Sequence, residues 1–474
     1  MRQMMFLAYV LLQAPVALAE PGAWDRVDLP EPTDTYSTDS VGERSTSMPW
    51  WETFQDATLT GLIEEALSAN GDIRAAWQGV VRWQGGSEQL RASMLPKVSL
   101  EAQRGLSPTD SLGFGIGFSG LGGYEADSYW SGSQGLSGQW GVDLFTTNLQ
   151  AWRAGRFDVQ AARGDRDAAV LGLATRIASA YFDARTARAQ QAIIEQQVQS
   201  NRVLLELARA RYEGGDAAGL DVLQQEVQLA ASEARLPTAQ LQVTLADYQL
   251  AALVGRRPGE GLPDLRPELP DLSAFSSVGV PAELLLARPD LRAASARVDS
   301  ARLRRLSATL AVLPALGVSG SYGKQVIDLD ELEEIDVWTL GLSASVPVFN
   351  GGLSLGRIKE ARAGERAAAD QLDQLVLNAI AEVEASLARE RAASEVLVAQ
   401  AAQLEASRLA LEEARIRYEG GLASYQQLLS VLDGYQNAQL AMLLAKRDRI
   451  GVRVSLHEAL GGEWTRHFPE PETK

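Results

Sequence analysis

The chain has 474 residues, 46% of them apolar, which is enough for a large buried core. Its 61 acidic and 44 basic side chains give a net charge of −17, which argues against nucleic acid as a partner because phosphate binding needs clustered lysine and arginine. The absence of cysteine removes disulfides and thiolate chemistry, and the only two histidines, His457 and His467, disfavour a histidine-centred catalytic or metal site. We therefore expect no enzymatic activity, no bound metal and no cofactor.

Residues 1–19 are predicted to form a signal peptide. Arg2 precedes an apolar run that begins at Met4, and Ala17-Leu18-Ala19 supplies an A-x-A cleavage site before Glu20. A buried N-terminal helix is the alternative. No cysteine follows the cleavage site, so lipidation is not expected, and no later apolar run reaches the roughly 18 residues of a membrane helix. Residues 20–48, rich in proline, threonine, serine and aspartate, are predicted to form an extended leader.

The rest of the chain contains an internal repeat. The pentapeptide Arg-Tyr-Glu-Gly-Gly at Arg211–Gly215 returns at Arg417–Gly421, and a weaker match joins Asp72–Ala76 to Asp290–Ala294. Each repeat is predicted to contain a helix, two strands, a long helix and a second long helix. The predicted boundaries are 49–255 for the first repeat, 256–280 for a linker, 281–461 for the second repeat and 462–474 for a C-terminal tail.

Strands are predicted at about 97–145 and 315–348, because apolar and polar residues alternate there. In the last strand Trp338, Leu340 and Leu342 alternate with Thr339 and Ser343, and the run continues to Val348. The pattern is typical of a membrane β-barrel wall, although a soluble sheet has the same alternation. The export signal and the lack of a second apolar layer favour the barrel. Four strands cannot close a barrel, so several chains must share one.

Long helices are predicted at about 149–254 and 353–460. In the first, apolar residues recur at alternating steps of three and four from Val170 to Tyr212, with Gln191 and Asn201 as polar exceptions. A helix from Leu149 to Tyr212 would be about 95 Å long. The paired glycines after each Arg-Tyr-Glu are predicted to cap these helices, and each chain segment then returns as a second helix. Pro237 is predicted to kink the first return helix.

The sequence resembles the TolC-like outer-membrane factor family in five segments: Trp50–Ala76, Arg211–Leu229, Arg288–Asp290, Val346–Gly352 and Arg417–Leu432. The resemblance implies a mainly α protein of the bacterial outer membrane with a long periplasmic extension. It further implies a homotrimer in which 12 strands form one β-barrel and 12 helices form an α-barrel. Such proteins are passive exit ducts of efflux pumps or type I secretion systems, and their expected partners are a periplasmic adaptor, an inner-membrane transporter and outer-membrane lipid.

Two groups of candidate site residues follow from this resemblance. The turns between the long helices are expected to dock the adaptor, besides capping the helices, through Arg211, Tyr212, Gly215, Arg417, Tyr418 and Gly421. The second group is a candidate pore constriction, formed by Gln426, Ser430 and Asp433 on one face of the last helix. Relatives often have leucine and aspartate at the first two of these positions. Asp433 would add the only acidic ring, unless it points outward.

Three further patterns have simpler interpretations. Gly115–Gly120 matches G-x-G-x-x-G, but a glycine-rich stretch follows where a dinucleotide site needs a helix, so an exposed loop is expected. The acidic cluster Asp328–Asp336 is predicted to be a solvated loop rather than a cation site. Glu382 and Glu384 are predicted to lie on a solvated helix face. A non-transporting exported coiled-coil scaffold remains the rival to a transport duct.

Overall fold

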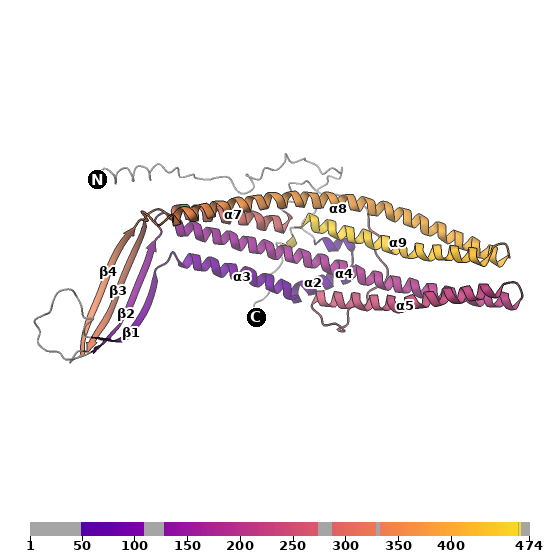
Figure 1. The fold of residues 1–474 in the computed structure, drawn as a ribbon, viewed down its shortest axis with the longest axis horizontal. Helices are drawn as coiled ribbons and strands as arrows, with labels where there is room; N and C mark the ends of the chain where they lie inside the picture. Colours follow the sequence, from indigo (N-terminus) through magenta and orange to yellow (C-terminus); the bar gives the residue numbers. More distant parts are fainter. Residues whose placement is uncertain (1–48, 109–127, 274–286, 329–331, 463, 466–474) are drawn as a thin grey trace, which may run out of the picture. The chain divides into compact units, whose positions relative to one another are not determined.

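The computed structural model describes residues 49–108, 128–273, 287–328, 332–462 and 464–465. The predicted signal peptide, the whole leader, the G-x-G-x-x-G segment and most of the C-terminal tail lie outside these residues. The described chain forms two compact units (Figure 1). One contains the sheet with the adjoining ends of α3 (Gly71–Ala92), α4 (Thr147–Glu213), α7 (Pro289–Leu310) and α8 (Leu353–Glu419), and the other contains the rest of these four helices together with the remaining ones. Among the described helices, none has the length and apolar character needed to span a membrane.

The first unit is built on a four-stranded antiparallel sheet in the order β1-β2-β3-β4. Its strands are β1 (Lys97–Pro108), β2 (Ser128–Val142), β3 (Ala315–Asp328) and β4 (Leu332–Ser345). The helices that lead into the two hairpins are α3 (Gly71–Ala92) and α7 (Pro289–Leu310).

The register confirms the predicted alternation of the two sheet faces. One row of paired residues is Leu100, Leu136, Tyr322 and Trp338, and the adjacent row on the opposite face is Ser99, Ser137, Ser321 and Thr339. Hydroxyls of the second row are hydrogen-bonded at 2.7 Å between Ser99 and Ser137 and between Ser321 and Thr339. Among the described residues nothing covers the apolar face, and Leu342, for example, is 80% exposed.

The strand ends differ from the prediction. β2 stops at Val142 and β4 at Ser345, so Leu144 and Val348 lie outside the sheet. The Asp143 carboxylate instead accepts a hydrogen bond from the Leu149 amide at 2.8 Å at the start of α4, and Pro347 has no amide for a sheet ladder.

The acidic cluster is also different from the predicted loop. Asp328 ends β3, while Glu333, Glu334 and Asp336 lie in β4, because the pairing of the two strands continues to Asp328 and Leu332. Lys324 contacts Glu334 across the strands at 2.9 Å. The charges of this region therefore belong mainly to a β-hairpin.

Glycines face one another along the junction between β2 and β3, where the two repeats meet. The directly paired residues are Gly135 with Gly323, Gly138 with Gly320, and Gly141 with Gly317. A Cβ atom on Gly135 would lie 2.6 Å from the Tyr322 carbonyl oxygen, and one on Gly323 would lie 2.5 Å from the Gln134 carbonyl oxygen. The two backbones are therefore too close at this pair to admit a side chain.

The long helices have equal lengths in the two halves of the chain. α4 (Thr147–Glu213) and α8 (Leu353–Glu419) each have 67 residues, and α5 (Gly219–Val254) and α9 (Tyr425–Leu460) each have 36. α5 continues through Pro237, so the proline does not end the helix.

The predicted heptad positions of α4 are buried from Val170 to Ala208, apart from the half-buried Gln191. Tyr212, the last predicted position, is instead 55% exposed. The reason is that Tyr212 faces Gly219 at the start of α5, which has no side chain to cover the ring.

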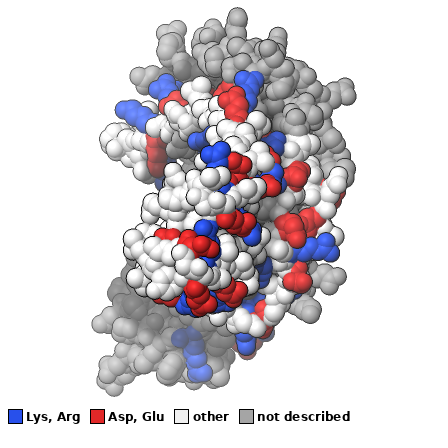
Figure 2. Space-filling view, turned by 90° about the vertical axis from the view of Figure 1, so that its right-hand side faces the viewer, with Lys and Arg blue, Asp and Glu red and all other residues white. Residues whose placement is uncertain are grey.

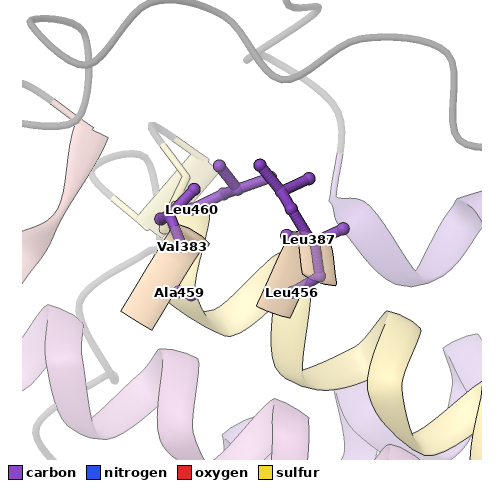
Figure 3. Close-up of a cluster of buried hydrophobic side chains, with 5 residues drawn as sticks. All are labelled: Val383, Leu387, Leu456, Ala459 and Leu460. Atoms are coloured by element: carbon purple, nitrogen blue, oxygen red, sulfur yellow. The ribbon is translucent and has the colours of Figure 1, made fainter. Parts of the chain in front are cut away.

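The second unit is held together by apolar contacts between helices. Val383 and Leu387 of α8 pack with Leu456, Ala459 and Leu460 of α9 (Figure 3).

The first described residues are fixed to the same unit. η2 (Trp50–Phe54) and α2 (Ala57–Ala69) follow each other directly. The Trp50 ring stacks on His457 with the ring centres 5.3 Å apart, and the rings of Trp51 and Trp464 meet edge to face with their centres 4.6 Å apart. These buried rings secure the N-terminal end of the described chain to α9 and the segment after it.

Candidate functional site

The two turns between the long helices have the same backbone geometry. Gly215 and Gly421 have φ of 83° and 70°, the left-handed conformation that only glycine adopts without strain. The amide of the following residue bonds back to the Arg211 carbonyl in the first turn and to the Arg417 carbonyl in the second, both at 2.8 Å. The repeated sequence thus forms the same Schellman-type helix end twice, as the paired glycines predicted.

The arginine and tyrosine side chains of the repeat differ in their surroundings. Arg211 donates a hydrogen bond to the backbone oxygen of Tyr418, and its guanidinium carbon lies 4.5 Å from the centre of the Tyr418 ring. Tyr418 is 4% exposed. By contrast, Arg417 forms an exposed ion pair with Glu413 at 2.6 Å on its own helix. The structure therefore joins Arg211 of the first helical hairpin, formed by α4 and α5, to Tyr418 of the second, formed by α8 and α9. Tyr212 and Arg417 are left at the surface.

Beneath the turns lies a buried polar cluster that the sequence analysis missed. The Tyr425 hydroxyl donates to Gln225 Oε1, and Gln225 Nε2 donates to the Asn201 carbonyl at 2.8 Å. Within the described residues, neither side-chain atom of Asn201 has a hydrogen-bond partner. The only sequence signal was that Asn201 interrupts an apolar heptad series. This cluster joins α4, α5 and α9 by directional bonds.

The two tyrosines of the second turn stay protonated over the physiological range. Burial raises the pKa of Tyr425 far above its usual value, with Tyr418 and Asp221 adding to the effect. Burial also raises the pKa of Tyr418, assisted by Asp221 and opposed by Arg211. The rings lie 5.4 Å apart. They act here as neutral packing and hydrogen-bonding groups.

Gln426, Ser430 and Asp433 are all exposed and share one side of α9, opposite the buried Leu428 and Leu432. Asp433 also has a contact with the first hairpin, because Gln228 Nε2 of α5 donates to its carboxylate at 2.6 Å. Opening the two hairpins away from each other would break this bond.

A groove of about 560 Å³ lies further along the helices, between α4 and the α8–α9 hairpin. Its walls combine leucines, glutamine amides and two arginines, including Gln197, Leu204, Arg408, Arg415 and Leu432. Figure 2 looks onto the hairpin ends and shows acidic and basic side chains interspersed there. Among the described residues, no three histidine, cysteine or carboxylate side chains are arranged to hold a metal ion.

Paired helical hairpins joined to a four-stranded sheet define the fold class of outer-membrane efflux channels. The sequence matches the family described as outer membrane efflux protein over residues 62–256 and 280–462. The chain belongs to this family. It is an outer-membrane efflux protein with a long periplasmic helical extension, and its family is one of channels rather than enzymes.

Three similar proteins illustrate the relationship. The pyoverdine export outer membrane protein OpmQ of Pseudomonas aeruginosa is 27% identical over 94% of this chain and 92% of its own length. The toluene efflux pump outer membrane protein TtgF of Pseudomonas putida is 27% identical over 91% of this chain and 88% of its own. The solved structure of the outer-membrane channel OprN is 27% identical, with a TM-score of 0.80 over 91% of this chain and 97% of that structure.

Proposed function

We propose that this protein is the passive exit duct of a tripartite efflux pump, working as a homotrimer with a 12-stranded β-barrel and a 12-helix α-barrel. The observation that carries the proposal is the sheet. It has one uncovered apolar face, and among the described strands none pairs with the outer edges of β1 and β4. Unpaired edges are not tolerated in lipid, so the edges must pair between subunits.

The proposed cargo is small molecules, delivered by a periplasmic adaptor and an inner-membrane transporter. OpmQ is named for pyoverdine export and TtgF for a toluene efflux pump, and these cargoes have little chemistry in common. Such relatives favour small-molecule efflux over type I protein secretion. They also support a duct that selects weakly, with the choice of cargo made by the transporter.

The hairpin turns are the proposed docking surface for the adaptor, and Gln426, Ser430 and Asp433 are the proposed constriction. Both lie at the same end of the hairpins, so docking and opening would act on the same contacts. The bond between Gln228 and Asp433 supports a closed position of the hairpins, because it joins α5 to α9 below the turns.

The assembly can be tested with the full chain in mild detergent. We expect the protein to be found in the outer-membrane fraction and to need detergent for its extraction. In detergent its mass should be about three times that of the mature chain, and in a planar bilayer it should give discrete conductance steps. A stable, detergent-independent monomer without conductance would contradict the proposal and favour the scaffold alternative.

A further inference from the structure

We propose that Arg417 lies on the ring of Tyr212 of the partner subunit, repeating between subunits the contact that Arg211 makes with Tyr418 within one. The inference rests on the proposed trimer and names one contact that would join its subunits. In a ring of six hairpins from three chains, first and second hairpins alternate. Each first hairpin therefore has a second hairpin on both sides, one from its own chain and one from the next.

The repeat makes the two sets of residues equivalent. Arg211 and Tyr212 correspond to Arg417 and Tyr418, and both pairs are held by turns with the same hydrogen bonds. Within one subunit, the arginine of the first hairpin meets the tyrosine of the second. The next junction in the ring would bring the arginine of the second hairpin to the tyrosine of a first hairpin.

Tyr212 and Arg417 are both available for this contact. Tyr212 is 55% exposed and the Arg417 side chain is 61% exposed. One edge of the Tyr212 ring lies near Gly219, where an added Cβ atom would be 3.4 Å from the ring. At the equivalent position of the second hairpin, Tyr425 packs against Tyr418. The first hairpin lacks that second ring, which leaves room beside Tyr212 for an incoming guanidinium.

The ion pair that Arg417 forms with Glu413 of its own chain does not prevent the contact with Tyr212 of the partner subunit. The pair is exposed on both sides, and such surface pairs contribute little to stability. An arginine over an aromatic face gains more once water is excluded. Arg211 has Leu207 in place of this acid, so its side chain is free of a competing carboxylate one turn back.

The contact between Arg211 and Tyr418 within one subunit also indicates which atoms of the tyrosine are needed for such a contact. Arg211 uses the face of the Tyr418 ring and the backbone oxygen, while the Tyr418 hydroxyl has no hydrogen-bond partner among the described residues. Tyr212→Phe should therefore keep the subunit contact, and Tyr212→Ala should lose it.

Cross-linking tests the proximity directly, because the natural chain has no cysteine. Tyr212→Cys combined with Arg417→Cys, treated in detergent with a short bis-maleimide, should give covalent dimers and trimers on denaturing gels. Tyr212→Cys combined with Arg415→Cys is the matched control, since Arg415 lines the groove beside α4 of its own chain. Arg211→Cys combined with Tyr418→Cys should cross-link only within a chain.

A double-mutant cycle tests the energetic contact. Tyr212→Ala and Arg417→Ala should each lower the temperature at which the detergent trimer dissociates, and the double variant should lose no more than the worse single one. Tyr212→Phe should match the natural protein. Additive losses, or equal losses for phenylalanine and alanine, would overturn the inference.

The same experiments separate this inference from the proposed function. A natural trimer that shows no 212–417 cross-link above the Arg415 control would refute the contact and leave the duct intact. A natural protein that is monomeric in every detergent would refute the duct itself.

Discussion

Asp433 has two properties that single substitutions can separate. It carries a negative charge on the exposed side of α9, and it accepts a hydrogen bond from Gln228 of α5. A charge in a narrow pore attracts cations, whereas the bond holds two hairpins together.

Asp433→Ala should raise the resting conductance and reduce the preference for cations at low salt. Gln228→Ala should raise the conductance in the same way but keep the cation preference, because the carboxylate remains. Planar-bilayer recordings at low and high salt measure both quantities. Normal conductance and selectivity in the Asp433 variant, with normal trimer formation, would remove this residue from the constriction.

Asn201 and Gln225 are both fully buried amides, yet among the described residues only Gln225 has partners for its side chain. Replacing an unpaired buried polar group by an apolar one of similar size is neutral or stabilising, whereas removing a paired one costs about 1–3 kcal/mol.

Asn201→Leu should therefore keep or raise the free energy of unfolding, and Gln225→Leu should lower it. Thermal unfolding of the detergent-solubilised protein, followed by circular dichroism, compares the two. A clear loss in Asn201→Leu would show that its amide is satisfied in the assembled protein.

The long elements were more predictable than their exact contacts. Heptads and paired glycines are local signals, so the predicted helices agree with α4, α5, α8 and α9 within two residues at each end. Strand ends depend on pairing with distant residues, which is why β2 and β4 stop before Leu144 and Val346. The partners of Arg211 and Arg417 could not be read from identical pentapeptides, because the difference arises from neighbouring hairpins.

At the sheet, the alternation predicts opposite effects of adjacent substitutions. Leu342→Arg on the apolar face should cost roughly 2–4 kcal/mol if that face meets lipid near the midplane, while Ser343→Arg should be much milder. Folding into lipid vesicles, monitored by heat-modified mobility on gels, measures the difference. Equal losses would show that the apolar face is not the lipid face.

The junction of α2 with the segment after α5 has a measurable pH dependence. Arg256 donates two hydrogen bonds of 2.7 Å to Glu65 and holds the pKa of that carboxyl below its usual value. A lowered pKa adds stability above the unfolded value of about 4.3, and this stability is lost as pH falls through the folded value.

Glu65→Gln should thus lower stability at pH 7 by up to about 1 kcal/mol, since both side chains remain partly exposed. The difference from the natural protein should shrink below about pH 4. Melting curves across this range, with the exposed neighbour Glu64→Gln as the control, would show it. A difference that stays constant with pH would mean that the ion pair is not its cause.

For the whole molecule, the repeat supplies a ring of nearly equivalent units from three chains in the proposed trimer. The helix lengths and turn geometry are kept between the halves, while the contacts of the arginine and tyrosine side chains at the hairpin ends have diverged. One copy can therefore change at a contact surface without altering the backbone plan of the other.

The paired glycines between β2 and β3 limit which amino acids can replace them. Gly135 and Gly323 block each other, so neither position can be rescued by a compensating change at its partner. Gly138 and Gly320 differ, because an added Cβ there would lie 3.8 Å and 3.5 Å from the nearest atoms. In a saturation library selected for export activity, positions 135 and 323 should accept glycine alone, while alanine survives at 138 and 320. The duplication would then have left one glycine pair at its join, Gly135 with Gly323, among the least mutable positions of the sheet.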